Sequence, residues 1–254
     1  MNIGIISGHL IPGLLQRPEH ITVETPYGPV VLRVAKTKQH TLFVVNRHGE
    51  EESLPPHRLN AQATIAALAE SHVQAVFSVG TVGSMTKSIA PGDFVVPHDF
   101  IDMTKSRPMT FFDDSRVHVD MTDPFCPTLR DALLAACRKE KKVTVHAKSV
   151  CLVTEGPRLE TAAEIKMFAP YADIVGMTLA PEVVLAREKG LCFGSLCLVC
   201  NMATGLQDRL TATEILGIYR QRRPLLSSIL RRTLESLPSQ VSCSCPRSLT
   251  QARL

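Results

Sequence analysis

Five short segments of this sequence place polar or glycine residues directly after an apolar stretch that has the composition of a buried strand. They are residues 47–49, 78–84, 154–160, 176–178 and 201–203. Arg47 offers a planar fork of N–H donors that suits phosphate, and the glycines of the second segment let backbone N–H groups approach an oxyanion. Asn201 offers both a donor and an acceptor, which can recognise the edge of a heterocycle. Because the carboxyl ends of strands border the crevice where open sheets bind ligands, we predict one shared pocket.

Each segment alone also has a simple structural interpretation. Arg47 and His48 fit a surface loop, residues 78–84 fit an ordinary strand exit, and Arg158 can pair with Glu155. Because all five segments follow a predicted strand, together they favour a shared pocket more than any single motif does.

Apolar and β-branched runs predict strands, and stretches with apolar residues at helical spacing predict helices between them. The predicted strands are 3–7, 30–35, 41–46, 75–79, 94–97, 148–154, 174–177 and 192–200, and the predicted helices are 56–70, 127–140, 161–168, 181–189 and 211–237. This alternation predicts an α/β fold, a single domain with a mixed, largely parallel central sheet flanked by helices. We expect the domain to occupy residues 1–237 and the polar residues 238–254 to form a C-terminal Cys-x-Cys tail.

Composition excludes several classes of protein. With 254 residues, a net charge of +4 and 44% hydrophobic residues, the chain can bury the core of one large α/β domain. No apolar run approaches the roughly 20 residues of a membrane helix, and the first residues predict a strand rather than a signal peptide, so we expect a cytoplasmic protein. The basic runs 139–142 and 220–223 indicate solvated helix faces rather than a nucleic-acid site. Motifs typical of nucleoside triphosphatases, dinucleotide dehydrogenases and zinc proteases do not occur.

Eight cysteines raise the question of a disulfide or a metal site. Six lie among apolar residues, where a free cysteine packs as a small hydrophobic side chain: Cys126, Cys137, Cys151, Cys192, Cys197 and Cys200. Cys197 and Cys200 together with Cys243 and Cys245 would supply the four thiolates of a zinc site, but strand residues three apart face opposite ways, which argues against this set. Cys243 and Cys245 lie in the polar tail with no core to join, where a redox-active or intersubunit disulfide is an alternative.

The five segments, in this order, resemble the methylthioadenosine/methylthioinosine phosphorylase branch of the trimeric purine nucleoside phosphorylases over nearly the whole chain. The most specific motifs are RHG (47–49), LPPHRLNAQATIAAL (54–68), PGDFVVPHDFIDMT (91–104), HVDMTDPFCP (118–127), TEGPRLET (154–161) and VGMTLAPEVVLARE (175–188), and the CSC at 243–245 is similar to the tail of archaeal members. The resemblance implies attack of phosphate, a co-substrate, on C1′ of a purine nucleoside through an oxocarbenium-like sugar. It implies no cofactor or metal, no nucleic-acid or membrane partner, and a homotrimer or a hexamer built as a dimer of trimers.

Carried over residue by residue, the resemblance assigns three groups of site residues. The catalytic residues are Arg47, His48 and Asn201, and the phosphate-binding residues are His9, Arg47, His48, Gly80, Thr81 and Thr178. The substrate-binding residues are His118, Leu159, Glu160, Met177, Asn201, Met202, Ala203 and Ala212. In this assignment Met177 lies under the sugar, and His118 reaches the neighbouring subunit's site. Ala212 and Ile215 would line the pocket of the 5′ group, and their apolar character favours methylthio while leaving inosine and guanosine open.

Two positions in the last segment bear on the choice of base. Adenine-specific members of the family carry aspartate at the positions of Asn201 and Ala203. A neutral amide fits N7 and O6 of hypoxanthine or guanine, so the resemblance implies a 6-oxopurine nucleoside such as S-methyl-5'-thioinosine or inosine.

Three departures from the family pattern concern the phosphate site. The first loop reads Ser-Gly-His-Leu where GGTG is usual, so His9 replaces a threonine; Gly80 replaces a polar residue; and Glu52 stands where a histidine is usual. If Glu52 faces the anion, two charges about 5 Å apart repel by roughly 3 kcal/mol at an effective dielectric constant near 20. If Glu52 points to solvent, nothing follows. Two alternatives therefore stay open, a nucleoside hydrolase in which Glu52 or His9 orients water and a non-catalytic nucleoside-binding homologue.

Overall fold

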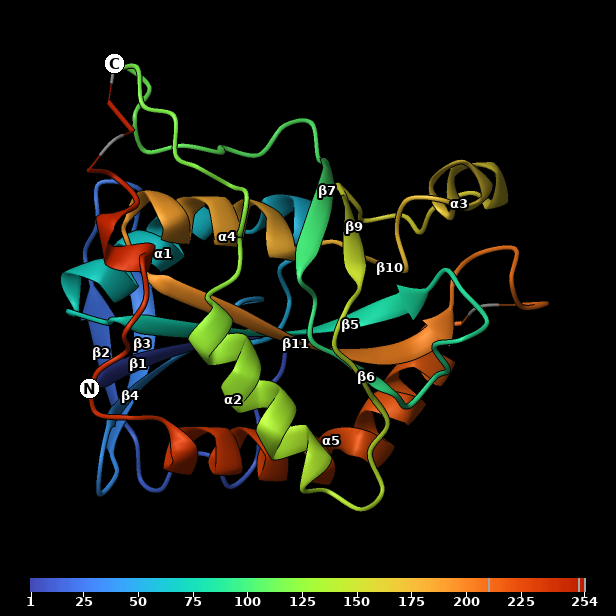
Figure 1. Ribbon diagram of the computed structural model, residues 1–254, viewed down its shortest axis with the longest axis horizontal. Coiled ribbons are helices and arrows are strands. Elements are labelled where there is room, and N and C mark those ends of the chain that lie inside the picture. Colours follow the sequence, from blue (N-terminus) through green and yellow to red (C-terminus); the bar gives the residue numbers. More distant parts are fainter. Residues whose placement is uncertain (210, 251, 254) are drawn as a thin grey trace.

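Eleven strands in the described part of the chain form one mixed β-sheet between two layers of helices (Figure 1). The computed structural model describes residues 1–209, 211–250 and 252–253. The strands are β1 (Asn2–Ser7), β2 (Glu19–Val23), β3 (Val30–Lys36), β4 (Thr41–Asn46), β5 (Ala75–Ser84), β6 (Phe94–Val95), β7 (Asp99–Met103), β8 (Val145–His146), β9 (Val150–Thr154), β10 (Ile174–Gly176) and β11 (Cys192–Met202). The helices are α1 (Ala61–Glu70), α2 (Pro127–Arg138), α3 (Ala162–Phe168), α4 (Leu179–Glu188) and α5 (Ala212–Ser236), with 3-10 turns at Pro56–Arg58 and Cys245–Arg247.

The sheet is mixed: β4, β1, β5 and β11 run parallel, whereas β10 is antiparallel to β5 and several outer pairs are antiparallel. Its main path runs β2-β3-β4-β1-β5-β10-β9-β7, while β11 pairs with β5 and leads to β6 and β8. β1 is parallel to β4 and β5, and β5 is parallel to β11. The β2–β3 and β3–β4 pairs are antiparallel. The predicted single-domain α/β fold with a mixed, largely parallel sheet is confirmed.

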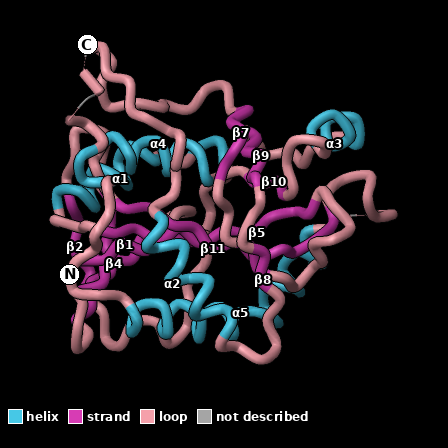
Figure 2. Tube along the Cα trace, in the orientation of Figure 1, coloured by secondary structure: helices cyan, strands magenta, loops and turns pink. Residues whose placement is uncertain are grey.

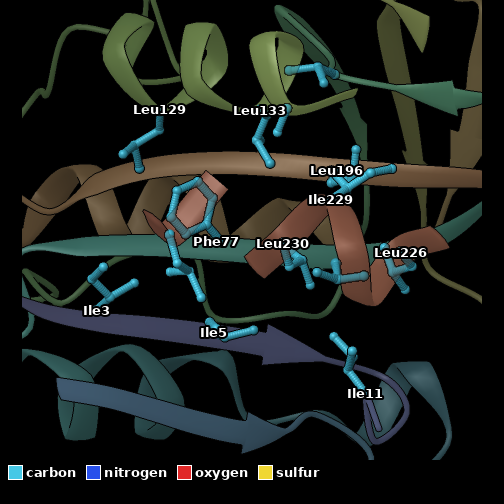
Figure 3. Packing of buried hydrophobic residues seen from close by; sticks show 14 of the residues in the cluster. Ile3, Ile5, Ile11, Phe77, Leu129, Leu133, Leu196, Leu226, Ile229 and Leu230 are labelled. Atoms are coloured by element: carbon cyan, nitrogen blue, oxygen red, sulfur yellow. The ribbon is translucent and has the colours of Figure 1, made fainter. Parts of the chain in front are cut away.

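Each face of the sheet carries its own hydrophobic core, because neighbouring residues of a strand point to opposite faces. Ile5 and Phe77 pack with α2 and α5 on one face, whereas Ile6 and Val76 pack with α1 and α4 on the other. Figure 3 shows the first core, where α2 and α5 side chains meet those of the central strands. Helix periodicity therefore predicted the layers correctly.

The largest differences from the predicted elements lie at the edges of the sheet and at the ends of two central strands. β4 has the predicted bounds, but β5 and β11 run on to Ser84 and Met202. The strands β2, β7 and β8 were not predicted, because their residues are exposed or half-buried and carry no apolar run. No helix of the described ranges is long and apolar enough to cross a membrane.

The segment after α5 is not a tail without a core, and that prediction is wrong. Cys245 is buried, and Cys243 packs against the α2–α5 core. The segment passes from the α5 face to the α4 face around one end of the sheet (Figures 1 and 2), and Ser248 donates a hydrogen bond to the Arg187 carbonyl of α4. Residues 251 and 254 of the predicted tail lie outside the described residues.

Candidate active site

A cavity of about 250 Å³ opens beside the central strand β5, and all five predicted segments contribute to its wall. On one edge, β5 pairs with β1 as far as Val79 and with β10 from Gly83 onward. Between these two residues that edge of β5 faces no strand of the described sheet, and the cavity occupies the gap. The predicted residues in its wall are His9, Arg47, His48, Gly80, Thr81, Leu159, Glu160, Met177, Thr178, Asn201 and Ala203.

Two of the five segments are strands rather than loops, which corrects the prediction. Residues 78–84 lie inside β5, and Asn201 and Met202 end β11. β11 has a register shift opposite Val82 and Gly83 that leaves Cys200 unpaired. Such a bulge re-aims the side chains that follow it, here Asn201 at the cavity wall.

Arg47 is held in a buried ion pair that the sequence did not reveal. Its Nε and Nη2 donate to the two carboxylate oxygens of Glu182, its Nη2 also to Ser78 Oγ at 2.8 Å, and its Nη1 to the Val79 carbonyl at 3.1 Å. Both charged side chains are 4% exposed. Since a guanidinium has five N–H bonds and four are used, one N–H on Nη1 stays available. Arg47 therefore offers a fixed hydrogen-bond donor whose charge Glu182 already balances.

His48 has one ring nitrogen fixed by the backbone. Its Nδ1 lies 2.6 Å from the Leu54 carbonyl oxygen, which assigns the proton to Nδ1 and leaves Nε2 as the acceptor of the neutral ring. Burial lowers the pKa of His48, although the Leu54 carbonyl opposes the shift. A Cβ at Gly8 would lie 3.2 Å from Nε2, so the first loop approaches this ring closely. His48 is thus an acceptor at the anion end of the cavity.

Thr178 is the residue before α4, yet its side chain makes no capping hydrogen bond. Threonine hydroxyls in this position usually bond a backbone N–H of the first turn. Its hydroxyl therefore stays available at the cavity wall, across from Gly80, where a Cβ would lie 3.9 Å from Thr178 Oγ1. Arg47, His48 and Thr178 form the part of the site predicted to bind phosphate.

Glu52 points neither at the cavity nor freely into solvent. Its Oε2 lies 2.8 Å from His9 Nδ1, and its Oε1 accepts hydrogen bonds from Leu10 N–H and Asn46 Nδ2. Partial burial opposes its ionisation, but these hydrogen bonds outweigh burial and keep the pKa of Glu52 below its ordinary value. His9 lies in the cavity wall and Glu52 does not. Glu52 therefore fixes the first loop, and the unpaired repulsion considered from the sequence is not present.

The opposite end of the cavity is formed by Asn201 and Ala203. Asn201 Nδ2 donates to the Met202 carbonyl at 2.9 Å, which fixes the plane of the amide. A Cβ on Gly83 would lie 2.9 Å from that nitrogen, so only glycine leaves room for the amide there. Ala203 is 2% exposed and carries no polar atom on its side chain. Positions 201 and 203 thus give this end of the cavity one neutral amide and no carboxylate.

Met177 and Glu160 lie between the two ends. Gly156 has φ +67°, in the left-handed region that favours glycine, and a Cβ there would lie 2.7 Å from Met177 Sδ, so the loop after β9 approaches the methionine closely. Glu160 is buried and accepts a hydrogen bond from Thr154 Oγ1, which leaves its second oxygen free for a ligand. Arg107 donates to the Met177, Ala180 and Glu155 carbonyls and thereby joins the two loops. The buried guanidinium of Arg107 thus fixes the positions of the two loops that carry Met177 and Glu155.

Three predicted substrate residues lie outside the cavity wall. Met202 ends β11 beside it, and Ala212 is exposed at the start of α5, although Ile215 one turn later does line the cavity. His118 is exposed, and its backbone N–H donates to the Ala252 carbonyl of the C-terminal segment. The cavity of its own chain does not include His118, so its assigned role in a neighbouring site stays a prediction.

Sequence reasoning missed Glu182 and Tyr219. Glu182 lies in the first turn of α4 among apolar residues, and an acid in such a stretch was the available signal. Tyr219 lines the cavity from α5, with its ring centroid 4.7 Å from that of His9. Its hydroxyl is buried and has no partner among the described residues, and burial raises the pKa of Tyr219 to about 12. The phenol thus remains a proton donor at neutral pH.

Comparisons with known proteins agree with this architecture. A model of the phosphorylase superfamily matches residues 2–235. The chain is 43% identical to the probable S-methyl-5'-thioinosine phosphorylase of Methanopyrus kandleri, over 99% of both chains. It is 39% identical to the probable 6-oxopurine nucleoside phosphorylase of Dictyoglomus turgidum, over 100% of this chain and 98% of the relative. A solved methylthioadenosine phosphorylase of Schistosoma mansoni in complex with adenine is similar, with a TM-score of 0.92 and 27% identity over 99% of this chain and 98% of that chain.

Proposed function

Because this chain belongs to the phosphorylase superfamily, we propose that its cavity binds a purine nucleoside and inorganic phosphate together and transfers the sugar to phosphate. The chain is a purine nucleoside phosphorylase-like enzyme, and the reaction gives a free base and a sugar 1-phosphate. The observation that carries the proposal is the arrangement of the cavity: Arg47, His48 and Thr178 at one end and Asn201 at the other.

The residues at the phosphate end would bind the nucleophile mainly through hydrogen bonds. Arg47 contributes its free N–H and Thr178 its free hydroxyl, while neutral His48 accepts a hydrogen bond from a phosphate or sugar hydroxyl. A preorganised site of this kind holds phosphate close to C1′ at no reorganisation cost during the reaction. The sugar becomes oxocarbenium-like as the glycosidic bond breaks. Met177 would cover the sugar, and the free Glu160 oxygen would accept from a sugar hydroxyl.

We propose a 6-oxopurine as the base. The amide of Asn201 can donate to N7, where negative charge develops as the base leaves, and Ala203 adds no carboxylate for an exocyclic amine. A site built for one hydrogen-bonding edge rejects a ligand with the other edge strongly. Two relatives of this chain are named for methylthioinosine and 6-oxopurine nucleosides. Apolar Ile215 in the cavity wall supports a methylthio group at the 5′ position.

Base release measured with and without phosphate tests the proposal. Inosine and methylthioinosine should release hypoxanthine only when phosphate is present, and adenosine and methylthioadenosine should react much more slowly. The Asn201→Asp/Ala203→Asp variant should raise the ratio of kcat/KM for adenine over hypoxanthine nucleosides by tenfold or more, roughly 1.4 kcal/mol. An unchanged ratio in a folded double variant would remove both residues from base selection.

A hydrolase would need a group that orients water where phosphate binds. The carboxylate of Glu52 is bound to His9 and Leu10 and is not part of the cavity wall. Glu52 is therefore not available to orient water there, and the relatives named as phosphorylases further support phosphorolysis over the hydrolase alternative.

We further propose a cytoplasmic homotrimer or dimer of trimers. Support for the location comes from the eight cysteines, none of which forms a disulfide in the structure, a pattern typical of reducing compartments. Support for the assembly comes from the family resemblance around His118, which lies exposed outside the cavity of its own chain. Sedimentation analysis of the purified protein distinguishes a trimer from a hexamer and from a monomer.

A further inference from the structure

Four cysteines from three separate parts of the chain meet near the C-terminal segment. Cys126 precedes α2, Cys192 begins β11, and Cys243 and Cys245 belong to the segment after α5. Their sulfur atoms all lie within 4.8 Å of one another, with Cys192 and Cys243 sulfurs 3.3 Å apart. Three of the four residues are buried. We call these residues the four-cysteine cluster. The set differs from the one considered from the sequence, because Cys197 and Cys200 pack on opposite faces of the sheet.

The spacing of the sulfurs fits one tetrahedral metal ion. Zinc binds thiolates at about 2.3 Å, so the sulfurs of a four-thiolate site are about 3.8 Å apart. All four sulfurs lie within 4.8 Å of one another and the Cys192–Cys243 pair lies at 3.3 Å, so small shifts of the side chains would bring them to this spacing. A disulfide would instead bring two sulfurs to about 2.05 Å. The four sulfurs therefore form one compact group that can surround a single zinc ion.

A buried cation beside the cluster indicates that the sulfurs carry negative charge. Arg187 is 8% exposed and directs Nη1 at Cys245 Sγ, 3.6 Å away, while Nε donates to the Asp120 carbonyl. No carboxylate oxygen of a described residue lies within 4.0 Å of its guanidinium nitrogens. A buried charge needs a partner of opposite sign. Four thiolates on one Zn²⁺ carry a net charge of about −2 and supply that partner, whereas disulfides are neutral.

We propose that one Zn²⁺ ion binds the four-cysteine cluster and fastens the C-terminal segment to the sheet. The four thiols lose their protons on binding, and the ion is closed to further ligands, as in structural zinc sites. The contact of this segment with the α4–β11 turn is close, because a Cβ on Gly190 would lie 3.3 Å from the Pro246 carbonyl oxygen. The ion has no part in the reaction of the cavity, so this inference stands apart from the proposed function.

Metal content of the full-length protein is the direct test. Reduced protein saturated with Zn²⁺ and passed over a desalting column should retain one zinc per chain. The Cys243→Ala/Cys245→Ala variant should retain less than about a tenth of that. Cys137→Ala is the matched control, since Cys137 is also buried on α2 but lies outside the cluster, and it should retain one zinc. Removing zinc with a chelator should lower the Tm of the wild type by about 5–10 °C and leave that of the double variant unchanged.

Two measurements on the wild type test the zinc site without relying on the folding of any variant. Cobalt in place of zinc should give the charge-transfer and ligand-field bands of a tetrahedral four-thiolate site. Protein denatured directly after purification should show eight alkylatable thiols. Fewer than eight thiols together with no retained zinc would identify disulfides and overturn the proposal. Eight thiols with no retained zinc after saturation would overturn it equally, because the cluster would then be a packing of free thiols.

Discussion

At the scale of single residues, the pair of Arg47 and Glu182 changes what a substitution at the anion end should do. Sequence alone suggests that Arg47→Ala removes phosphate binding and leaves the fold intact. The structure places a buried carboxylate against the guanidinium, so the single variant leaves Glu182 uncompensated. Breaking a buried ion pair by removing one partner costs about 3–5 kcal/mol.

We therefore expect Arg47→Ala to lower both stability and phosphate-dependent turnover, and Arg47→Met/Glu182→Leu to recover most of the stability without the activity. Replacing both members of a buried pair by apolar residues is often neutral for stability. Thermal unfolding and initial rates measured on the same preparations separate the two effects. A single variant with the Tm of the wild type, or a double variant with its turnover, would contradict this account of Arg47.

Glu52 is the second residue for which the structure changes the expected effect, and here the sign of the effect on phosphate binding reverses. Repulsion of phosphate would make its removal favourable, but its carboxylate anchors His9 and Leu10. We expect Glu52→Gln to raise the phosphate KM by up to about fivefold, because a partly exposed ion pair contributes at most roughly 1 kcal/mol. The lowered pKa of Glu52 means that the anchor is fully present above pH 4.5 and is lost as the pH falls through the folded value.

The phosphate KM at saturating nucleoside is the measurement for Glu52→Gln, with Glu51→Gln in the same loop as the control. A tenfold decrease of KM in the Glu52 variant would show that its charge does repel the anion.

Among the helices and strands, the pairing of β5 with β11 positions the Asn201 amide that is proposed to bind the base. We expect Gly83→Ala to displace Asn201, since the new Cβ would lie 2.9 Å from Asn201 Nδ2. The variant should fold and lose tenfold or more in kcat/KM, roughly 1.4 kcal/mol of transition-state stabilisation. Gly217→Ala on α5, where a Cβ meets nothing within 4 Å, is the control and should keep the rate of the wild type. Equal rates for the two variants would show that Asn201 tolerates displacement.

Apolar periodicity predicted the buried helices and strands but gave no signal for the exposed and half-buried strands. β4 was predicted to the residue because its apolar residues 42–45 form a continuous buried run between the polar residues Thr41 and Asn46. β2 was missed because it is an exposed edge strand whose charged residues hide its pairing with β3. Because glycine and asparagine usually end strands, the sequence predicts loops at the ends of β5 and β11, whereas these residues continue the strands and line the cavity.

The site was predicted only in part, for a similar reason. Arg47 and Asn201 are visible in the sequence because each polar residue follows an apolar run. The partner of Arg47 is 135 residues away in the chain, and only the packing of α4 against the sheet brings it near. The sequence also predicts Cys126 and Cys192 to be core residues, and both are buried. Their proximity to Cys243 and Cys245 depends on the fold, because these residues are far apart in the chain.

At the scale of the whole molecule, the position of His118 makes the assembly testable through activity. If His118 completes a neighbouring site, His118→Ala and a folded Arg47 variant should each be nearly inactive alone. Mixed chains assembled together should regain activity, because some sites then contain both an intact Arg47 and an intact His118. Co-refolded or co-expressed mixtures provide the measurement. Activity no higher than the average of the separate variants would place His118 outside the neighbouring site.

The central claim is that phosphate, and not water, receives the sugar. The most direct measurement is the mass of the sugar product formed from inosine or methylthioinosine with phosphate in ¹⁸O-labelled water. The account predicts a sugar 1-phosphate without solvent oxygen, formed in equal amount to free hypoxanthine. A free sugar that carries ¹⁸O at C1 would contradict it and establish hydrolysis instead.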